Sequence, residues 1–368
     1  MHIMKKNLWL IGLASVYSLE SYALTIYERN GTTLRFSGEM NMVLEKQYYR
    51  THRYPLNETL NESMNTNLAN NGSEIRFKAK HKLSDELSLF ARVGWNLNNY
   101  EKNATRDRFG ELSVRRAYLG IEHQKYGQLR IGRQSLFANE ISVSDFDYSV
   151  GNSERLLAYS GKSVIRYDYT GIENLQLSSH YHFSEKTDSF PRQSNRKLKD
   201  GVGIAGLYDI SLNDRQAFSI GAAYSYVNYL DRTNQRASQE GAQLSLLLFS
   251  KNWLFGLDTG LRYRKQPNLF EDEKLFLIKS GIRYAYSDQG SVYTNCAYSV
   301  AKRQNLNLEE EIDRIVRRSA VFGTDYSVHQ NVSAYLEAGY AYDLAYSGGN
   351  KLEQGIEKII ASGLEIYW

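Results

Sequence analysis

Most of this chain alternates apolar and polar residues with the two-residue period of a β-strand. The pattern is clearest over residues 217–226, where every second residue is apolar or aromatic and those between are mostly small or polar. Successive side chains of a strand point to opposite faces, so one face of this segment is apolar. The same alternation recurs over residues 253–264, 276–286 and 333–342. The sequence therefore predicts an all-β fold.

The connections between the expected strands alternate between short and long. The short connections are residues 84–86, 125–127, 171–174, 211–215, 250–252, 287–290 and 329–331. The long connections, which contain all three prolines, are residues 50–72, 98–111, 135–162, 184–199, 230–240, 266–272, 304–309 and 344–350. Short turns on one side and long loops on the other are typical of transmembrane β-barrels. Seven short and eight long connections predict sixteen strands in an antiparallel, up-and-down barrel.

Composition favours this barrel over a soluble β-sandwich. The chain has 29 Tyr and 27 Gly but only 3 Pro. Tyrosine is suited to the water–lipid boundary, and proline removes a donor from the hydrogen-bond ladder of a sheet. In such a barrel we expect apolar side chains to face lipid and charged side chains to face a water-filled lumen.

The N-terminus has the pattern of a cleaved secretory signal peptide. Lys5 and Lys6 precede an apolar run over residues 8–14, and Ser21 and Ala23 place small residues before a cleavage site. A membrane-spanning helix needs about 20 apolar residues, which this run does not reach. We therefore expect residues 1–23 to be removed and residues 24–368 to form one barrel.

Charge and cysteine content exclude two other classes. The formal net charge is +4, or +3 after loss of the signal peptide, which is too small and too dispersed for a nucleic-acid-binding protein. The single Cys296 excludes an intramolecular disulfide framework.

The histidines do not indicate a metal or catalytic site. His180 and His182 would share one face of a strand, but no third metal ligand is evident. No nucleophile motif accompanies any histidine, so we expect no catalytic residues, no metal and no cofactor.

Several segments resemble the general porins of Gram-negative bacteria. The strongest are Val-Arg-Arg-Ala-Tyr-Leu-Gly-Ile at 114–121 and Tyr-Gly-Gln-Leu-Arg-Ile-Gly-Arg at 126–133. Residues 24–31, 33–38 and 73–78 are similar to the opening strands of that family. The resemblance covers nearly the whole mature chain. It implies a trimeric, sixteen-stranded channel in the outer membrane, in contact with membrane lipid and lipopolysaccharide.

The C-terminal segment supports the resemblance. Leu364, Ile366 and Trp368 alternate and end on an aromatic residue. In the porin family this implies an assembly signal that the barrel-insertion machinery reads. An ordinary last strand is the alternative.

The resemblance also implies a constriction. In the family the third loop, here residues 135–162, folds inward, and acidic side chains on it face arginines of the barrel wall. The candidate loop residues are Glu140, Asp145, Asp147 and Glu154. The candidate wall residues, chosen by alternation, are Arg76, Lys78, Arg92, Arg115 and Arg130. Arg115 matches a constriction arginine of the family motif.

Some positions depart from the family pattern. Glu74 replaces an expected arginine, with Arg76 two residues later on the same face, and Glu39 lies where relatives often have a basic residue. In relatives the second loop latches onto a neighbouring subunit, which implies a contact for Glu101 or Glu111. Alternation points Arg133 outward.

The function that these features predict is passive diffusion of ions and small hydrophilic solutes. The first alternative is a substrate-selective channel for a sugar or an anion, since Tyr293 and Tyr335 should point into the lumen. The second is an outer-membrane barrel enzyme. The preference between cations and anions stays open, because the loop is acidic and the strands supply many arginines.

Overall fold

The protein is described from a computed structural model. It describes residues 23–97, 112–151, 154–185, 197–213, 215–230, 236–265, 272–304 and 312–368. The expected signal peptide, apart from Ala23, lies outside these residues, as do Glu101 and Glu111.

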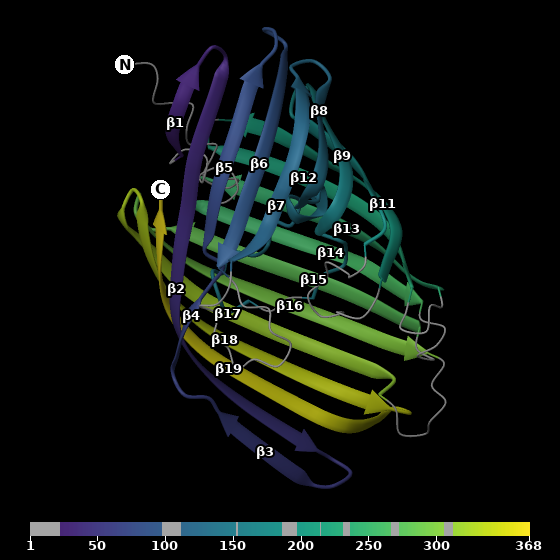
Figure 1. The fold of residues 1–368 in the computed structure, drawn as a ribbon. Helices are drawn as coiled ribbons and strands as arrows, with labels where there is room; N and C mark the ends of the chain where they lie inside the picture. The colour runs from purple at the N-terminus through teal and green to yellow at the C-terminus, as the bar shows by residue number, and fades with distance from the viewer. Residues whose placement is uncertain are drawn as a thin grey trace.

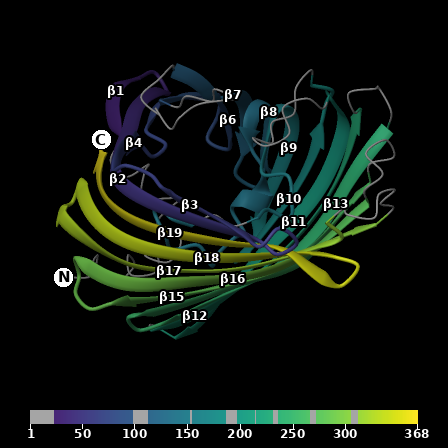
Figure 2. The same cartoon turned by 90° about the horizontal axis from the view of Figure 1, so that it is seen from below.

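Within these described residues, sixteen antiparallel strands pair into a closed ring. Figures 1 and 2 show the ring from two sides. The ring closes where β19 pairs with β2, from Glu353 opposite Arg53 to Tyr367 opposite Glu39. The strands of the ring, in order, are β2 (Thr32–Arg53), β5 (Glu74–Lys82), β6 (Leu87–Leu97), β7 (Leu112–His123), β8 (Gly127–Ser135), β9 (Ser160–Ile172), β10 (Leu175–His182), β11 (Lys197–Asn213), β12 (Gln216–Leu230), β13 (Arg236–Ser250), β14 (Trp253–Lys265), β15 (Asp272–Ala285), β16 (Gly290–Gln304), β17 (Arg314–His329), β18 (Val332–Ser347) and β19 (Asn350–Tyr367). The predicted sixteen-stranded barrel is confirmed.

Three shorter strands add to one part of this ring. β1 (Leu24–Arg29) pairs with the start of β2, and β3 (Glu58–Ser63) and β4 (Asn67–Asn70) pair with its later part. The long connection expected over residues 50–72 contains strands of its own: β2 continues into a hairpin with β3, which projects from the barrel in Figure 1. The last expected loop, 344–350, is a tight turn with positive φ at Gly348 and Gly349.

The two faces of the ring have opposite character. Side chains such as Leu119, Ile204 and Phe322 are each 63% exposed on the outer face. Charged side chains on the inner face are nearly inaccessible, for example Glu337 at 1% and Glu74 at 2%. This is the inverse of a soluble sandwich, because the apolar face points away from the interior. In the described part of the chain no helix is long and apolar enough to cross a membrane.

The C-terminus completes the ring next to the N-terminal strands. The backbone of Trp368 exchanges two hydrogen bonds with Gly38, of 2.8 and 3.1 Å. A Cβ at position 38 would lie 2.4 Å from the Trp368 indole, so a glycine at this position leaves room for the indole where the barrel closes. Leu364 and Ile366 face outward, 43% and 40% exposed. This placement agrees with the predicted alternation, and the assembly signal itself stays a prediction.

Candidate functional site

The described part of the segment between β8 and β9, residues 136–151 and 154–159, lies inside the barrel and is here called the inner loop. It begins with a single 3-10 turn, Phe137–Asn139, and Phe137 is buried. Ile141 and Leu157 are buried in one apolar cluster with Leu275 and Leu277 of β15. Apolar contacts therefore hold the inner loop against the wall, and the predicted inward-folded third loop is confirmed.

Two carboxylates of the wall bind the backbone of the inner loop. Asp258 of β14 accepts hydrogen bonds from the amides of Val143 (3.1 Å) and Ser144 (3.0 Å). The Ser142 and Ser144 hydroxyls donate to the same carboxylate. Asp258 and the second anchoring carboxylate, Glu337 of β18, are each 1% exposed. Since hydrogen bonds to charged groups are about twice as strong as neutral ones, these carboxylates are strong anchors.

The second anchor, Glu337 of β18, holds the tip of the inner loop. It accepts from the amides of Tyr148 (2.6 Å), Ser149 (2.9 Å) and Val150 (3.0 Å). The inner loop therefore crosses the barrel interior, from β9 at one end to β18 at its tip.

Inward-facing glycines give the inner loop room to approach the wall. A Cβ at Gly256 would lie 2.2 Å from the Val143 carbonyl oxygen, and one at Gly281 would lie 2.3 Å from that of Ser144. Both distances are too short for any side chain. Gly339 leaves similar room for Val150. Any larger residue at these positions would push the backbone of the inner loop away from its anchors.

All four acidic residues predicted on the inner loop lie near polar partners on the wall. Glu140 forms a bidentate ion pair with Arg166 of β9, at 2.8 and 3.1 Å. The other three contact β14, β15 and β16: Asp145 with Lys279 (2.8 Å), Asp147 with Asn295, and Glu154 with Arg262 (3.9 Å). Asp145 is still 46% exposed, so it also faces the interior.

Five adjacent strands bring arginines to the inner face, and one arginine from each strand belongs to the set here called the arginine ladder. Its members are Arg76 of β5, Arg92 of β6, Arg116 of β7, Arg130 of β8 and Arg166 of β9. Lys78 lies opposite Arg92, and Arg130 lies opposite Arg166. The inward placement predicted for Arg76, Lys78, Arg92 and Arg130 agrees with this geometry. Arg133 points outward and donates to the Val114 carbonyl oxygen at 2.6 Å.

A β-bulge changes what alternation predicts on β7. Arg116 lies opposite Gly94, whereas Val114 lies opposite Trp95, so Arg115 is the extra residue. Both arginines reach Glu74, at 3.2 Å from Arg115 and 3.7 Å from Arg116. Glu74 thus lies among positive charges, and Arg76 is a third neighbour at 4.0 Å.

Two members of the arginine ladder were missed from the sequence. Arg116 was missed because strict alternation selects only one of two adjacent arginines. Arg166 was missed although residues 164–168 of β9 alternate and place it on the inner face. Arg166 is 1% exposed and also pairs with Asp168 at 2.7 Å, so it connects the wall to the inner loop through Glu140.

The inward-pointing tyrosines form a support beneath the tip of the inner loop. Tyr148 stacks on Tyr335 with ring centroids 4.6 Å apart and lies 6.1 Å from Tyr293. Tyr293 and Tyr335 are each 4% exposed. The Tyr293 hydroxyl donates to Glu337 at 2.7 Å. Because these rings are covered, they hold the inner loop and do not offer a stacking surface to a solute.

The two histidines of β10 face the interior side by side, with ring centroids 5.1 Å apart. His182 is 2% exposed. Among the described residues no group of three His, Cys, Asp or Glu side chains is placed to hold a metal ion.

Burial raises the pKa of Asp147 to about 6, and the nearby carboxylates of Asp145 and Glu337 add to the increase. The native loop therefore holds this proton more tightly than the unfolded chain does, and the resulting stabilisation disappears as pH rises from about 4 through about 6.

We expect the interior to lose one negative charge as pH falls from 7 to 5. The reversal potential in a salt gradient should then shift toward anion preference, with a midpoint near pH 6. The variant Asp147→Asn should lack this step. An equally large step in the variant would contradict the assignment.

Comparison with known proteins agrees with this geometry. A family model described as Gram-negative porin matches residues 14–344. The chain belongs to this family. A "Major outer membrane protein" of Pasteurella multocida is 25% identical over 362 residues, which are 94% of this chain and 95% of that protein. Another from strain Pm70 is 24% identical over 392 residues, covering 99% and 100%.

Several solved structures share the fold. OmpT of Vibrio cholerae superposes with a TM-score of 0.68 at 14% identity, covering 94% of this porin and 99% of that chain. OmpF of Salmonella typhi, in complex with daunomycin, gives 0.66 at 14%, covering 94% and 100%. An anion-selective porin from Comamonas acidovorans gives 0.64 at 12%, covering 92% and 100%. This porin is an outer-membrane channel for solutes, as predicted.

Proposed function

We propose that this porin is a homotrimeric, weakly selective channel for passive diffusion, and that its constriction lies between the inner loop and the arginine ladder. Solutes cross it without chemical change, so the porin is not an enzyme. The observation that carries the proposal is the inner loop itself, which is held across the barrel interior by Asp258 and Glu337. A segment fixed in this way narrows the water-filled path of a sixteen-stranded barrel.

The charges on the two sides support a transverse field. Basic side chains gather on β5–β9, whereas Asp145 and Asp147 lie on the inner loop beside Lys279 and Asn295. Low-dielectric walls strengthen such a field. Because most charges have an oppositely charged neighbour, the field orients solutes but gives only a weak overall preference for one sign of ion.

Further proposals concern residues around the barrel. Trp368, Ile366 and Leu364 would serve the assembly machinery, the outward apolar belt would contact lipid and lipopolysaccharide, and residues 1–23 would be cleaved. A solved neighbour, OmpT of Vibrio cholerae, is described as a trimer form and has a TM-score of 0.66. It supports the trimer by analogy only.

The test is single-channel recording of the refolded mature protein in a planar bilayer with a potassium chloride gradient. We expect large conductance steps in groups of three and a small reversal potential. A fully inserted barrel that passes no current would refute the proposal, and single isolated steps would refute the trimer.

A further inference from the structure

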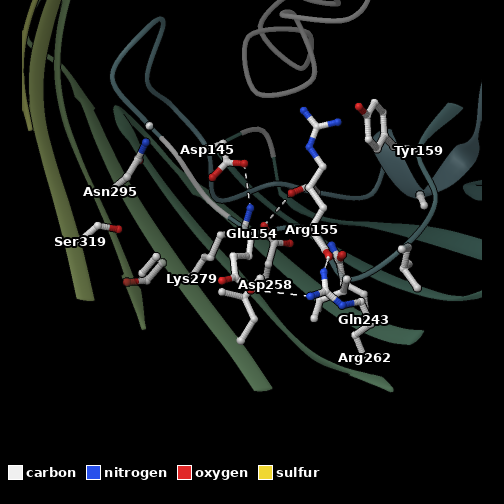
Figure 3. Close-up of a pocket in the computed structure, with 18 of the residues that line it drawn as sticks. Asp145, Glu154, Arg155, Tyr159, Gln243, Asp258, Arg262, Lys279, Asn295 and Ser319 are labelled. Carbon is white, nitrogen blue, oxygen red and sulfur yellow. Dashed lines mark hydrogen bonds and ion pairs between the residues drawn. The ribbon is translucent and has the colours of Figure 1, made fainter. Parts of the chain in front are cut away.

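A cavity of about 690 Å³ lies between the inner loop and the wall formed by β13–β17 (Figure 3). Its wall side includes the small residues Ala297 and Ser319, and its loop side includes Asp145, Glu154 and Arg155. No residue of the arginine ladder lines it, so it lies apart from the constriction proposed above. The cavity carries many charges, and their distribution is uneven.

One end of the cavity is acidic. Asp145, Asp147 and Asp258 line it, with Lys279 as the basic group beside them. Lys279 lies directly opposite Asp258 in the sheet and forms an ion pair with Asp145. Asp145 therefore lies at the same height along the barrel wall as Asp258. Asp145 is 46% exposed, so it is open to a positively charged group. Figure 3 shows Asp145 and Asn295 on this side. Three carboxylates and one lysine leave an excess of two negative charges.

The other end is basic. The Glu273 carboxylate accepts a hydrogen bond from Arg262 at 2.7 Å. The nearest nitrogens of Arg264 and Arg303 lie 3.5 and 3.8 Å from the same carboxylate. A second carboxylate, Glu154, lies 3.9 Å from Arg262. Arg155 lies over the Tyr159 ring, 3.6 Å from its centroid, and its carbonyl oxygen accepts from Arg262 at 2.6 Å. Four arginines and two carboxylates leave an excess of two positive charges.

The spacing of the two ends sets the size of a matching solute. Asp258 and Arg262 lie four residues apart on β14, which corresponds to about 13 Å along the strand. An extended peptide covers about 3.3–3.6 Å per residue, so about three or four residues fill this span.

We propose that this cavity binds zwitterionic solutes, namely short peptides whose ammonium group lies near Asp145 and whose carboxylate lies near Arg262 and Arg303. The inference rests on the proposed function, because the solute enters through the channel. A zwitterion makes a favourable ionic contact at both ends of the cavity. An anion of the same length gains at the basic end only, a cation at the acidic end only, and a neutral solute at neither.

The test uses the refolded mature porin in a planar bilayer, with four tripeptide probes of nearly equal size. Triglycine is zwitterionic, N-acetyl-triglycine anionic, triglycinamide cationic, and N-acetyl-triglycinamide neutral. Solute dwell times are measured from interruptions of the open-channel potassium chloride current. We expect triglycine to dwell about tenfold longer than the neutral probe and longer than either singly charged probe.

Variants locate the effect. Asp145→Asn should reduce the dwell time of triglycine to that of the anionic probe, and Arg303→Gln should shorten it toward that of the cationic probe. Arg262→Gln is a second test of the basic end and should also shorten the dwell time of triglycine. Arg303→Gln is the cleaner variant, because Arg262 also donates to the carbonyl oxygen of Arg155 in the inner loop. Glu62→Gln and Lys351→Gln, on exposed β3 and the exposed start of β19, are charge-matched controls that should leave all dwell times unchanged.

Equal dwell times for triglycine and the anionic probe would overturn the proposal in favour of a simple anion site. Equal dwell times for all four probes would overturn it as well, while normal conductance steps would leave the channel function intact. If an inserted barrel gave no steps in potassium chloride alone, the channel function would fail and this inference with it.

Discussion

Replacing Asp258 with asparagine and Glu337 with glutamine in one chain is expected to release the inner loop from the wall. The two carboxylates accept five backbone amides of the inner loop. Changing a charged acceptor to a neutral one costs about 1 kcal/mol per hydrogen bond, so the free energy that holds the inner loop against the wall should fall by several kcal/mol. The single-channel conductance should rise and become noisy, because the inner loop no longer narrows the path continuously.

A second double variant controls for the change in charge. Asp343→Asn with Glu357→Gln likewise removes one aspartate and one glutamate from the inner wall, but in the described part of the chain these two residues pair with Arg317 and Tyr49 rather than with the inner loop. This control should keep a quiet channel of normal conductance. If both double variants gave the same conductance and noise, the anchors would not hold the constriction.

Removing three members of the arginine ladder is expected to have the largest effect on ion preference. In the triple variant Arg92→Gln, Arg116→Gln and Arg130→Gln, the wall opposite the inner loop loses three positive charges, whereas Asp145 and Asp147 remain. The cation-to-anion permeability ratio should rise about threefold or more, because low-dielectric walls focus the field of the remaining carboxylates. The measurement is the reversal potential in a potassium chloride gradient.

The matched control removes three positive charges from the outer surface. Lys274, Arg318 and Lys358 lie over the rings of Tyr263, Tyr298 and Tyr48. Their replacement by glutamine should leave the reversal potential unchanged at high salt, where screening is short-ranged. A triple ladder variant with the same reversal potential as this control would show that the arginine ladder does not face the permeation path.

The strands could be predicted from the sequence because lipid imposes a strict rule on each of them. Every backbone group must pair within the sheet, and alternate side chains must be apolar. Weakly patterned segments obey it too: residues 241–249 lie within β13, paired on both sides. The hairpin of β3 was missed because Glu58–Ser63 lies outside this rule: it is fully exposed and mostly polar.

The constriction was less predictable because its contacts depend on local irregularities. A bulge at Arg115 lets two neighbouring arginines reach one carboxylate, and alternation has no means of locating a bulge. The acidic residues of the inner loop were found, but their partners were not, because Lys279 and Asn295 lie more than a hundred residues away. Inward-facing glycines such as Gly256 and Gly281 were a usable signal, since they mark where the inner loop lies.

The anchors of the inner loop also fix when the constriction forms during assembly. Val143 and Asp258 are separated by 115 residues, and Val150 and Glu337 by 187. Contacts this distant in sequence form slowly, since a long stretch of chain must be ordered first. The tip of the inner loop has no anchoring carboxylate until β18, which carries Glu337, has joined the sheet. Asp258 and the apolar contacts to β15 can hold the first part of the inner loop earlier, but its tip is fixed only when β18 is in place, shortly before β19 closes the ring on β2. Fixing the tip is therefore expected among the last steps of assembly.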